Sequence, residues 1–293
     1  MNDDPGRAAI RDFLTTRRAR LTPAQVGLQP GGGRRRVAGL RREEVAVLAG
    51  VSTDWYTRLE KGHVSGVSDE VLDAVARALQ LDEAERVYLF DLARAGRRAS
   101  RAPRRRRSTV LPERIQWMLD SMSGSAAFVA NGRMDVLAAN DLARALYAPM
   151  FAGTAPGEDR PANIARFQFL DPAARELIPD WEGATGVTAA LLRTEAGRDP
   201  GNRDLRQLVG ELSTLSEDFR TRWAAHDVRL HHAGHKQFVH PDVGPLDLVY
   251  HSMDVSADGS RTLVMTVYTA EPGTDSADRL QLLASWAASR ASL

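Results

Sequence analysis

The chain contains no cysteine among its 293 residues. Without thiols there can be no disulfide, thiolate zinc site, iron–sulfur cluster or cysteine nucleophile. The chain also lacks an apolar run of about 20 residues, the length that a membrane-spanning helix needs. Its first ten residues, MNDDPGRAAI, are acidic and polar rather than typical of a signal peptide. We therefore expect a cytoplasmic protein without membrane association.

The motifs of common enzymes are also missing. The sequence has no GxSxG, no Walker A pattern and no HExxH, and glycines 31–33 do not form GxGxxG. Six of the seven histidines lie between 226 and 251. Adjacent residues on a strand point to opposite faces, so His231 and His232 would not converge on one metal ion. We expect no metal, cofactor or enzymatic activity; exposed or pH-sensitive histidines are favoured over a metal site.

The charged residues, in contrast, are distributed unevenly along the chain. Residues 1–107 hold 22 basic and 14 acidic residues, a net charge of +8, whereas residues 108–293 hold 17 and 24, a net charge of −7. The net charge of +1 conceals this division. A basic first half and an acidic second half indicate that the first half meets a polyanion.

The first 95 residues predict five short helices. Residues 7–21 place apolar side chains at helical spacing, and Pro23 ends that pattern. Ser68 can cap a fourth helix, and Asp82 and Glu85 have the spacing of a capping box at the start of a fifth, which Gly96 would end. The second and third helices are expected at 41–49 and 52–61.

Residues 96–110 hold seven arginines and almost nothing to bury, which predicts a linker, either a spacer or a non-specific DNA contact. From about residue 111 the pattern is mixed and predicts an α+β domain. Helices are expected near 112–122, 140–150, 172–195 and 203–226. Strands are expected near 126–129, 134–138, 228–232, 236–239, 246–251 and 262–268.

The segment RREEVAVLAGVSTDWYTRLEKG carries the strongest signal. Two helices that cross steeply need a small contact residue, here Ala46, and a short turn, here Gly50, which tolerates positive φ. Ser52 can cap the second of these helices. The shared core is expected to contain Val45, Leu48, Ala49, Val51, Tyr56 and Leu59. The segment predicts a helix-turn-helix between about Arg42 and Lys61; an αα-corner in another helical protein is the alternative.

Residues 7–95 resemble the phage-repressor (XRE-type) helix-turn-helix domain, and LRREEVAVLAGVSTDWYTRLEKG is similar to its core signature. The resemblance implies a recognition helix at 52–61 in the major groove of double-stranded DNA. The implied base contacts are Thr53, Asp54, Thr57 and Arg58. Arg58 is favoured for guanine, with a phosphate contact as its alternative. The implied phosphate contacts are Ser52, Lys61 and Arg42, which stands where the family usually has glutamine.

Two further features belong to this half. In proteins of this type an arginine of the first helix often pairs with a glutamate at the end of the third. Arg18 and Glu60 fit that pair, with Arg17 as the competing partner and separate solvation as the alternative. Gly33 precedes three arginines, a pattern that suits DNA-backbone or minor-groove contact, although a solvated charge run would look the same. These arginines are Arg34, Arg35 and Arg36.

The second half also resembles a known domain. The segments NGRMDVLAANDLARALYAPM, ARFQFLDPAARELIPDW and FVHPDVG are similar to the ligand-binding domain of MmyB-like regulators over about 111–285. The resemblance implies a PAS-like fold, in which an antiparallel sheet with helices against one face encloses a pocket. It also implies a fatty-acid-like effector.

The residues alone do not establish whether this domain contains a ligand pocket. Ten apolar side chains of this half either line an acyl pocket or form plain core, and each buried CH₂ contributes about 0.8 kcal/mol in both cases. They are Phe128, Leu137, Leu142, Leu146, Tyr147, Met150, Phe167, Phe169, Leu191 and Trp223. For a carboxylate head group, the nearest candidates by sequence are Arg144, Arg222 and His226.

Together these features predict an all-α helix-turn-helix domain at 1–95, an arginine-rich linker at 96–110 and a PAS-like domain at 111–293. The function that they predict is a homodimeric, sequence-specific transcriptional regulator whose second domain binds an apolar effector. The alternative is a regulator in which that domain serves only dimerisation or protein interaction.

Overall fold

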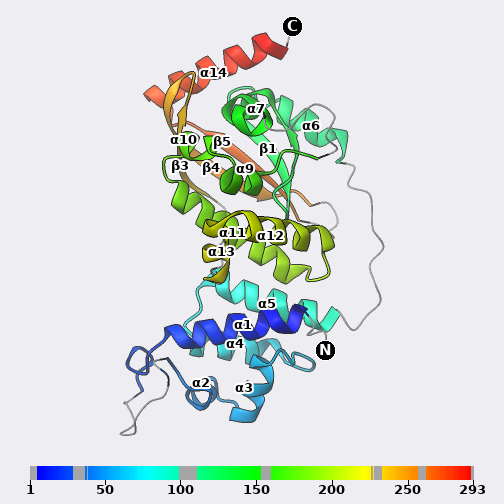
Figure 1. Ribbon diagram of the computed structural model, residues 1–293, viewed down its shortest axis with the longest axis vertical. Coiled ribbons are helices and arrows are strands. Elements are labelled where there is room, and N and C mark those ends of the chain that lie inside the picture. Colours follow the sequence, from blue (N-terminus) through cyan, green and yellow to red (C-terminus); the bar gives the residue numbers. More distant parts are fainter. Residues whose placement is uncertain are drawn as a thin grey trace. The chain divides into compact units, whose positions relative to one another are not determined.

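The computed structural model describes residues 5–28, 37, 39–98, 111–152, 160–225, 227, 233–256 and 262–291. The described residues form two compact units, one built mainly from 5–98 and the other mainly from 111–291. The first unit is helical and the second combines helices with one sheet (Figure 1). The predicted fold class, an all-α domain followed by an α+β domain, is confirmed.

The first unit contains one 3-10 helix and five α-helices among its described residues. They are α1 (Pro5–Arg20), η1 (Ala24–Val26), α2 (Arg42–Ala49), α3 (Thr53–Glu60), α4 (Asp69–Ala78) and α5 (Glu83–Arg98). Both predicted caps are present, since the Ser68 hydroxyl accepts the Val71 N–H and Asp82 and Glu85 exchange backbone-to-side-chain hydrogen bonds of 2.8 and 3.2 Å.

The predicted end of α5 at Gly96 is wrong, because the helix continues to Arg98. A Cβ at Gly96 would lie 2.6 Å from a methyl group of Val64. Glycine at this position therefore permits close packing within a helix and does not end it. The rest of the linker, 99–110, lies outside the described residues.

The core of the first unit joins all five α-helices. Ile10, Phe13 and Leu14 of α1 are buried against residues of α2 to α5. Phe13 meets Tyr88 of α5 edge-on at 5.0 Å between ring centroids. This packing is what stabilises such short helices, since an isolated helix of eight residues is marginal in water.

The second unit is built around a five-stranded antiparallel sheet in the order β2-β1-β5-β4-β3. The strands are β1 (Ala126–Asn131), β2 (Val136–Ala139), β3 (Ala233–His240), β4 (Gly244–Asp254) and β5 (Leu263–Thr269). Five of the six predicted strands correspond to these, whereas 228–232 lies outside the described residues. The strand β3 forms one edge of the sheet, with Lys236 opposite Leu248 of β4.

Nine helices of the second unit accompany the sheet among its described residues. They are α6 (Glu113–Asp120), α7 (Asp141–Leu146), α8 (Ala148–Ala152), α9 (Ile164–Leu170), α10 (Ala173–Leu177), α11 (Trp181–Arg198), α12 (Arg203–Leu215), α13 (Glu217–Ala224) and α14 (Asp275–Ala291). The predicted helix 203–226 is in fact two, because Ser216 caps a new helix by accepting the Phe219 N–H. Helices α9 and α14 were not predicted.

The sheet has two different faces. One face packs against α7 to α11 and α14 and forms the main core of this unit, which we call the inner face (Figure 1). The opposite face is covered at β1, β2 and β5 by α6, where Leu119 is fully buried against Ala127 and Val129. Helices therefore lie on both faces, and the expectation of helices on one face holds only in part.

Candidate functional site

The turn between α2 and α3 has the predicted geometry. Gly50 adopts φ 68°, and its N–H reaches the carbonyls of Ala46 and Val47 at the end of α2. An added Cβ at Gly50 would meet nothing within 4 Å, so it is the backbone angle that favours glycine here. Two residues later the Ser52 hydroxyl accepts the Trp55 N–H at 3.1 Å and starts α3. The predicted helix-turn-helix is confirmed.

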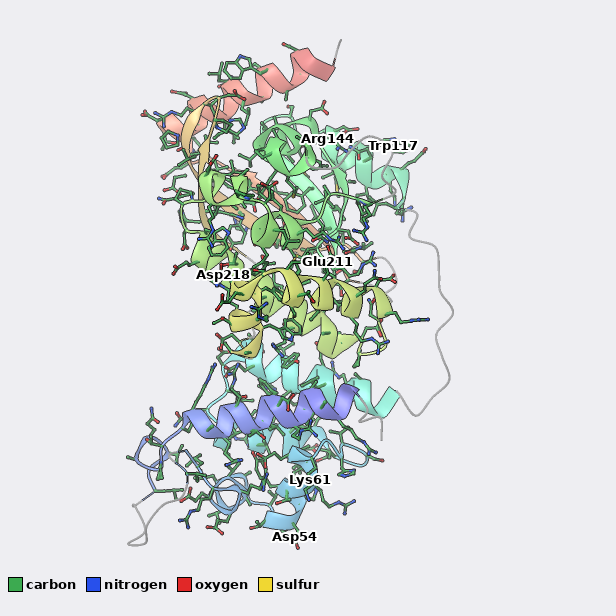
Figure 2. All side chains as sticks on the ribbon, in the orientation of Figure 1. Asp54, Lys61, Trp117, Arg144, Glu211 and Asp218 are labelled. Atoms are coloured by element: carbon green, nitrogen blue, oxygen red, sulfur yellow. The ribbon has the colours of Figure 1, made fainter. Side chains whose placement is uncertain are left out.

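The two sides of α3 differ in burial. Tyr56, Leu59 and Glu60 are buried against the other helices of the unit. The predicted base-contacting and phosphate-contacting residues lie on the other side. Of these, Ser52, Thr53, Asp54, Arg58 and Lys61 are exposed and Thr57 is half-buried, and Figure 2 labels Asp54 at the start of α3 and Lys61 directly after the helix.

A buried carboxylate connects three helices behind this surface. Glu60 is only 1% exposed, and its Oε1 accepts hydrogen bonds from Arg18 Nε at 2.9 Å and Thr15 at 3.1 Å. Arg18 also donates to the Leu40 carbonyl at 2.7 Å. The predicted Arg18–Glu60 pair is thus confirmed. The competing Arg17 pairs instead with Glu85 of α5 at 2.7 Å.

Arg42, predicted as a phosphate contact, is held from behind by the same carboxylate. Its Nε donates to the second oxygen of Glu60, although its side chain is still 48% exposed. The Glu60 carboxylate therefore links α1, α2 and α3. Burial and the neighbouring Glu60 charge also raise the pKa of Tyr56, so this phenol is protonated at neutral pH.

Not every candidate on the DNA-binding side can be placed. Arg34, Arg35 and Arg36 lie outside the described residues. Val47 was missed in the sequence reasoning, although it lies on α2 and is 74% exposed. An exposed apolar side chain beside the turn suits contact with a thymine methyl group. Helical spacing was the available signal, since Val45, Ala46 and Ala49 take the buried positions of α2.

Eight of the ten predicted apolar ligand residues of the second unit divide into two groups, and the other two, Leu137 and Leu191, are half-buried. Phe128, Leu142 and Leu146 belong to the inner-face core, as do Tyr147, Met150 and Phe167. Phe169 and Trp223 lie instead in an aromatic cluster of α9 and α13 around Phe219, whose ring stacks on Trp223 at 5.5 Å. From the sequence, all of these residues had been grouped together as the lining of one pocket or as plain core.

The predicted head-group residues already have partners or lie outside the description. Arg144 is exposed, as Figure 2 shows, and its guanidinium lies over Phe151. Arg222 pairs with Asp218 at 3.2 Å and lies 5.0 Å from the Trp181 ring. His226 is outside the described residues. Trp181 belongs to the inner-face core and Phe151 packs against it, so both described arginines lie at the border of that core.

A polar cluster within the inner face was not found from the sequence. The Lys236 Nζ donates to the Tyr147 hydroxyl at 3.1 Å, and this hydroxyl lies 3.0 Å from that of Tyr268. Burial raises the pKa of both tyrosines, so both phenols are protonated at neutral pH. The three residues come from β3, the end of α7 and β5, and only the fold brings them together.

A shallow pocket lies elsewhere on this unit, between α7, α8 and α14. It is lined by Ala145, Ala148, Asp242, Leu283, Trp286 and Ala287. None of the thirteen predicted ligand residues, ten apolar and three for the head group, belongs to its lining. In the described residues no group of three or more histidines and carboxylates is placed to hold a metal ion.

Comparison with known families agrees with this architecture. The family model of the MmyB-like transcription regulator ligand binding domain matches residues 111–283, more than half of the chain. The chain belongs to the MmyB-like transcription regulators. A second family model, described as a helix-turn-helix domain, matches residues 10–89 of the regulator. No curated protein matches its sequence.

The two matches confirm the predicted helix-turn-helix domain and the predicted MmyB-like ligand-binding domain, while the phage-repressor type of the first domain stays a prediction. The regulator is a DNA-binding transcription regulator with a helix-turn-helix domain followed by an MmyB-like ligand-binding domain. These are the domains of a transcription regulator. Among the residues that the structure describes, no helix is long and apolar enough to cross a membrane.

Proposed function

We propose that this regulator is a cytoplasmic homodimer that binds a specific inverted repeat in DNA through α3. The observation that carries the proposal is the Glu60 carboxylate, which fixes α3 to α1 and α2 while the opposite side of α3 is exposed. A helix held in this way presents its side chains in one orientation. That rigidity is what base recognition in the major groove requires.

Within this surface the residues have different roles. Arg58, with its bidentate guanidinium, contacts a guanine edge, while Thr53, Asp54 and Thr57 contact neighbouring bases. Ser52, Lys61 and Arg42 bind phosphates, as do Arg34, Arg35 and Arg36 before α2. The DNA-binding domain extends to the end of α5 at Arg98. It is followed by the linker, at 99–110, and by the effector domain, at 111–293.

Dimerisation is assigned to the effector domain. Of the nine large apolar side chains that are exposed among the described residues, seven belong to the second unit, including Trp117, Met253 and Trp286. A single helix-turn-helix buries little surface, and two half-sites about one helical turn apart multiply the affinity. Light scattering of the full chain at tens of micromolar should give twice the 32.1 kDa of one chain. A mass of one chain would contradict the dimer.

The effector is an apolar small molecule held at the inner face, where aromatic and aliphatic side chains from the sheet and its helices meet. Its occupancy changes DNA affinity through different affinities for two states of the protein, with a typical coupling of about 1–3 kcal/mol. The alternative is a domain that serves only dimerisation or protein interaction, which the exposed apolar side chains would equally support.

Native mass spectrometry of gently purified protein distinguishes a domain that binds an effector from one that serves only dimerisation or protein interaction. We expect an added mass of a few hundred daltons, and we expect removal of this mass to change operator affinity about 5- to 150-fold. A protein without added mass, whose DNA affinity is indifferent to every fatty acid tried, would favour the alternative.

A further inference from the structure

The two edges of the sheet in the second unit differ. Along the edge strand β2, the Val136 N–H donates to the Ala162 carbonyl at 2.8 Å. Just before β2, the Met134 carbonyl accepts the Ile164 N–H at 3.0 Å, so residues 162–164 cover this edge. The other edge strand, β3, has no such cover, because among the described residues no backbone group outside β4 bonds to its N–H and C=O groups (Figure 1). One edge of the sheet is therefore open.

The hydrogen bonds of β4 establish which groups of β3 face this open edge. In an antiparallel sheet, the N–H and C=O of one residue point to one neighbouring strand, and those of the next residue point to the other. The Asp247 N–H donates to the Ser276 hydroxyl of α14 at 2.9 Å. Directly after β4, the Val255 N–H donates to the Leu263 carbonyl of β5 at 2.9 Å. The odd-numbered residues of β4 therefore face away from β3, and Pro245, which has no N–H, occupies one of these positions.

The even-numbered residues of β4 are thus the ones that bond to β3. The register places Leu246 opposite Phe238 and Leu248 opposite Lys236. It follows that the odd-numbered residues of β3 direct their N–H and C=O groups to the open edge. Such a row of donors and acceptors is a template for pairing with another extended strand. The residues of this row are Ala233, His235, Gln237 and Val239.

The strand β3 has few of the features that keep an edge from pairing. Proteins protect exposed edges with prolines, bulges, short strands or charges. The eight residues of β3 include no proline, and their register with β4 runs without a break from Ala233 to His240. Lys236 is the single lysine, arginine or carboxylate residue of the strand, and it donates to Tyr147 on the inner face.

We propose that β3 pairs antiparallel with β3 of a second copy of this chain, with the Gln237 residues of the two copies opposite each other. The pairing joins the two five-stranded sheets into one continuous sheet. This inference rests on the proposed function, because it assigns the interface of the proposed homodimer. A second copy is favoured as the occupant because the edge is complementary to itself.

Charge selects the register of this pairing. A two-fold axis at Lys236 would place two ammonium groups directly opposite each other, which destabilises a sheet. With the axis at Gln237, Lys236 lies opposite Phe238 of the second copy instead. The two Gln237 residues then exchange backbone hydrogen bonds, and so does each pair of His235 and Val239. The Val239 side chain, which is 46% exposed, is covered by the same contact.

The absence of cysteine allows a direct test, since one introduced thiol reports on one position. In full-length Gln237→Cys, the two Cα atoms should lie about 5.5 Å apart, within the range of a disulfide. Copper-catalysed oxidation at tens of micromolar should convert most of the protein to a linked dimer on a non-reducing gel. Gln207→Cys, exposed on α12, is the matched control and should remain unlinked.

Two further thiols test the register. In the proposed pairing, His235 lies opposite Val239 of the second copy, and the two copies of either residue are roughly 13 Å apart along the strands. His235→Cys alone and Val239→Cys alone should therefore not cross-link. A mixture of the two variants after subunit exchange should do so. Cross-linking of either variant alone would overturn the register.

A proline at the same position tests the contribution of the edge itself. Gln237→Pro removes an N–H that faces the open edge and leaves the hydrogen bonds to β4 in place. Loss of both hydrogen bonds donated by the two copies should raise the Kd of the dimer about 5- to 150-fold in sedimentation velocity. Gln237→Ala keeps the N–H and should dimerise like wild type. Circular dichroism checks that the proline variant is folded; if it is not, the cysteine variants decide.

The outcomes distinguish this interface from the homodimer itself. If wild type is a monomer at tens of micromolar, the homodimer of the proposed function is rejected and this interface with it. If wild type is a dimer but Gln237→Cys does not cross-link, or if a folded Gln237→Pro dimerises as tightly as wild type, the homodimer stands and the β3 interface is overturned.

Discussion

Replacing Glu60 by alanine should lower the free energy of unfolding of the DNA-binding domain by about 3–5 kcal/mol. The carboxylate is 1% exposed and holds the side chains of Arg18, Arg42 and Thr15. Without it, the guanidinium of Arg18, which is 13% exposed, keeps its charge but loses the paired anion. Urea unfolding followed by circular dichroism measures the loss.

Glu43 provides the matched control on α2. It is 61% exposed and pairs with Arg41 at 3.3 Å, so its replacement by alanine should change stability by less than about 1 kcal/mol. If Glu60→Ala were as mild as Glu43→Ala, the carboxylate would not be what fixes α3. The basis for the proposed recognition surface would then be lost.

Replacing Arg58 by alanine should weaken binding to the preferred DNA site by about 1–3 kcal/mol, or roughly 5- to 150-fold, and relax selectivity at one base pair. Arg58 is exposed on the outer side of α3, away from the buried Tyr56 and Leu59. The loss should appear in the specific site and not in random duplex. Fluorescence anisotropy with both duplexes measures it.

Two other sets of variants test whether the effect of Arg58→Ala is specific to base recognition. Arg77→Ala removes the same charge from an exposed position on α4 and should leave the ratio of specific to random affinity unchanged. Neutralising Arg34, Arg35 and Arg36 should weaken both duplexes alike and flatten the salt dependence of log Kd. If Arg58→Ala also leaves that ratio unchanged, the arginine binds phosphate, which was the alternative drawn from the sequence.

Local signals in the sequence were sufficient to predict where most helices of the DNA-binding domain begin. Ser52, Ser68 and the Asp82–Glu85 pair cap the helices that they were expected to cap. Such caps act within three or four residues, so the sequence itself contains both partners. Gly96 misled because a glycine that permits close packing looks the same as one that ends a helix.

The second domain was harder because its elements depend on distant partners. Helix α9 has buried residues on every side, Gln168 included, so it has no helical periodicity to detect. Helix α14 did carry a signal, with Leu280, Leu283 and Ala287 at helical spacing and buried, and it was overlooked. The sequence alone was therefore sufficient to predict α14.

The polar cluster of Lys236, Tyr147 and Tyr268 could not have been derived from the sequence. Lys236 and Tyr147 are 89 residues apart and Tyr147 and Tyr268 are 121 apart, and they meet only through the order of strands in the sheet. A lysine in the polar segment HHAGHKQFV also looks exposed. The nearest head-group candidates by sequence were Arg144, Arg222 and His226, and the two that the structure describes have other partners.

The central claim is that the regulator recognises a specific DNA sequence through two copies of α3. Selection of bound duplexes from a random pool, with the full-length protein at physiological salt, tests it most directly. The account predicts an enriched inverted repeat whose half-sites are about one helical turn apart and contain a guanine that Arg58→Ala no longer selects. A pool that shows no enriched sequence, or a single motif without two-fold symmetry, would contradict it.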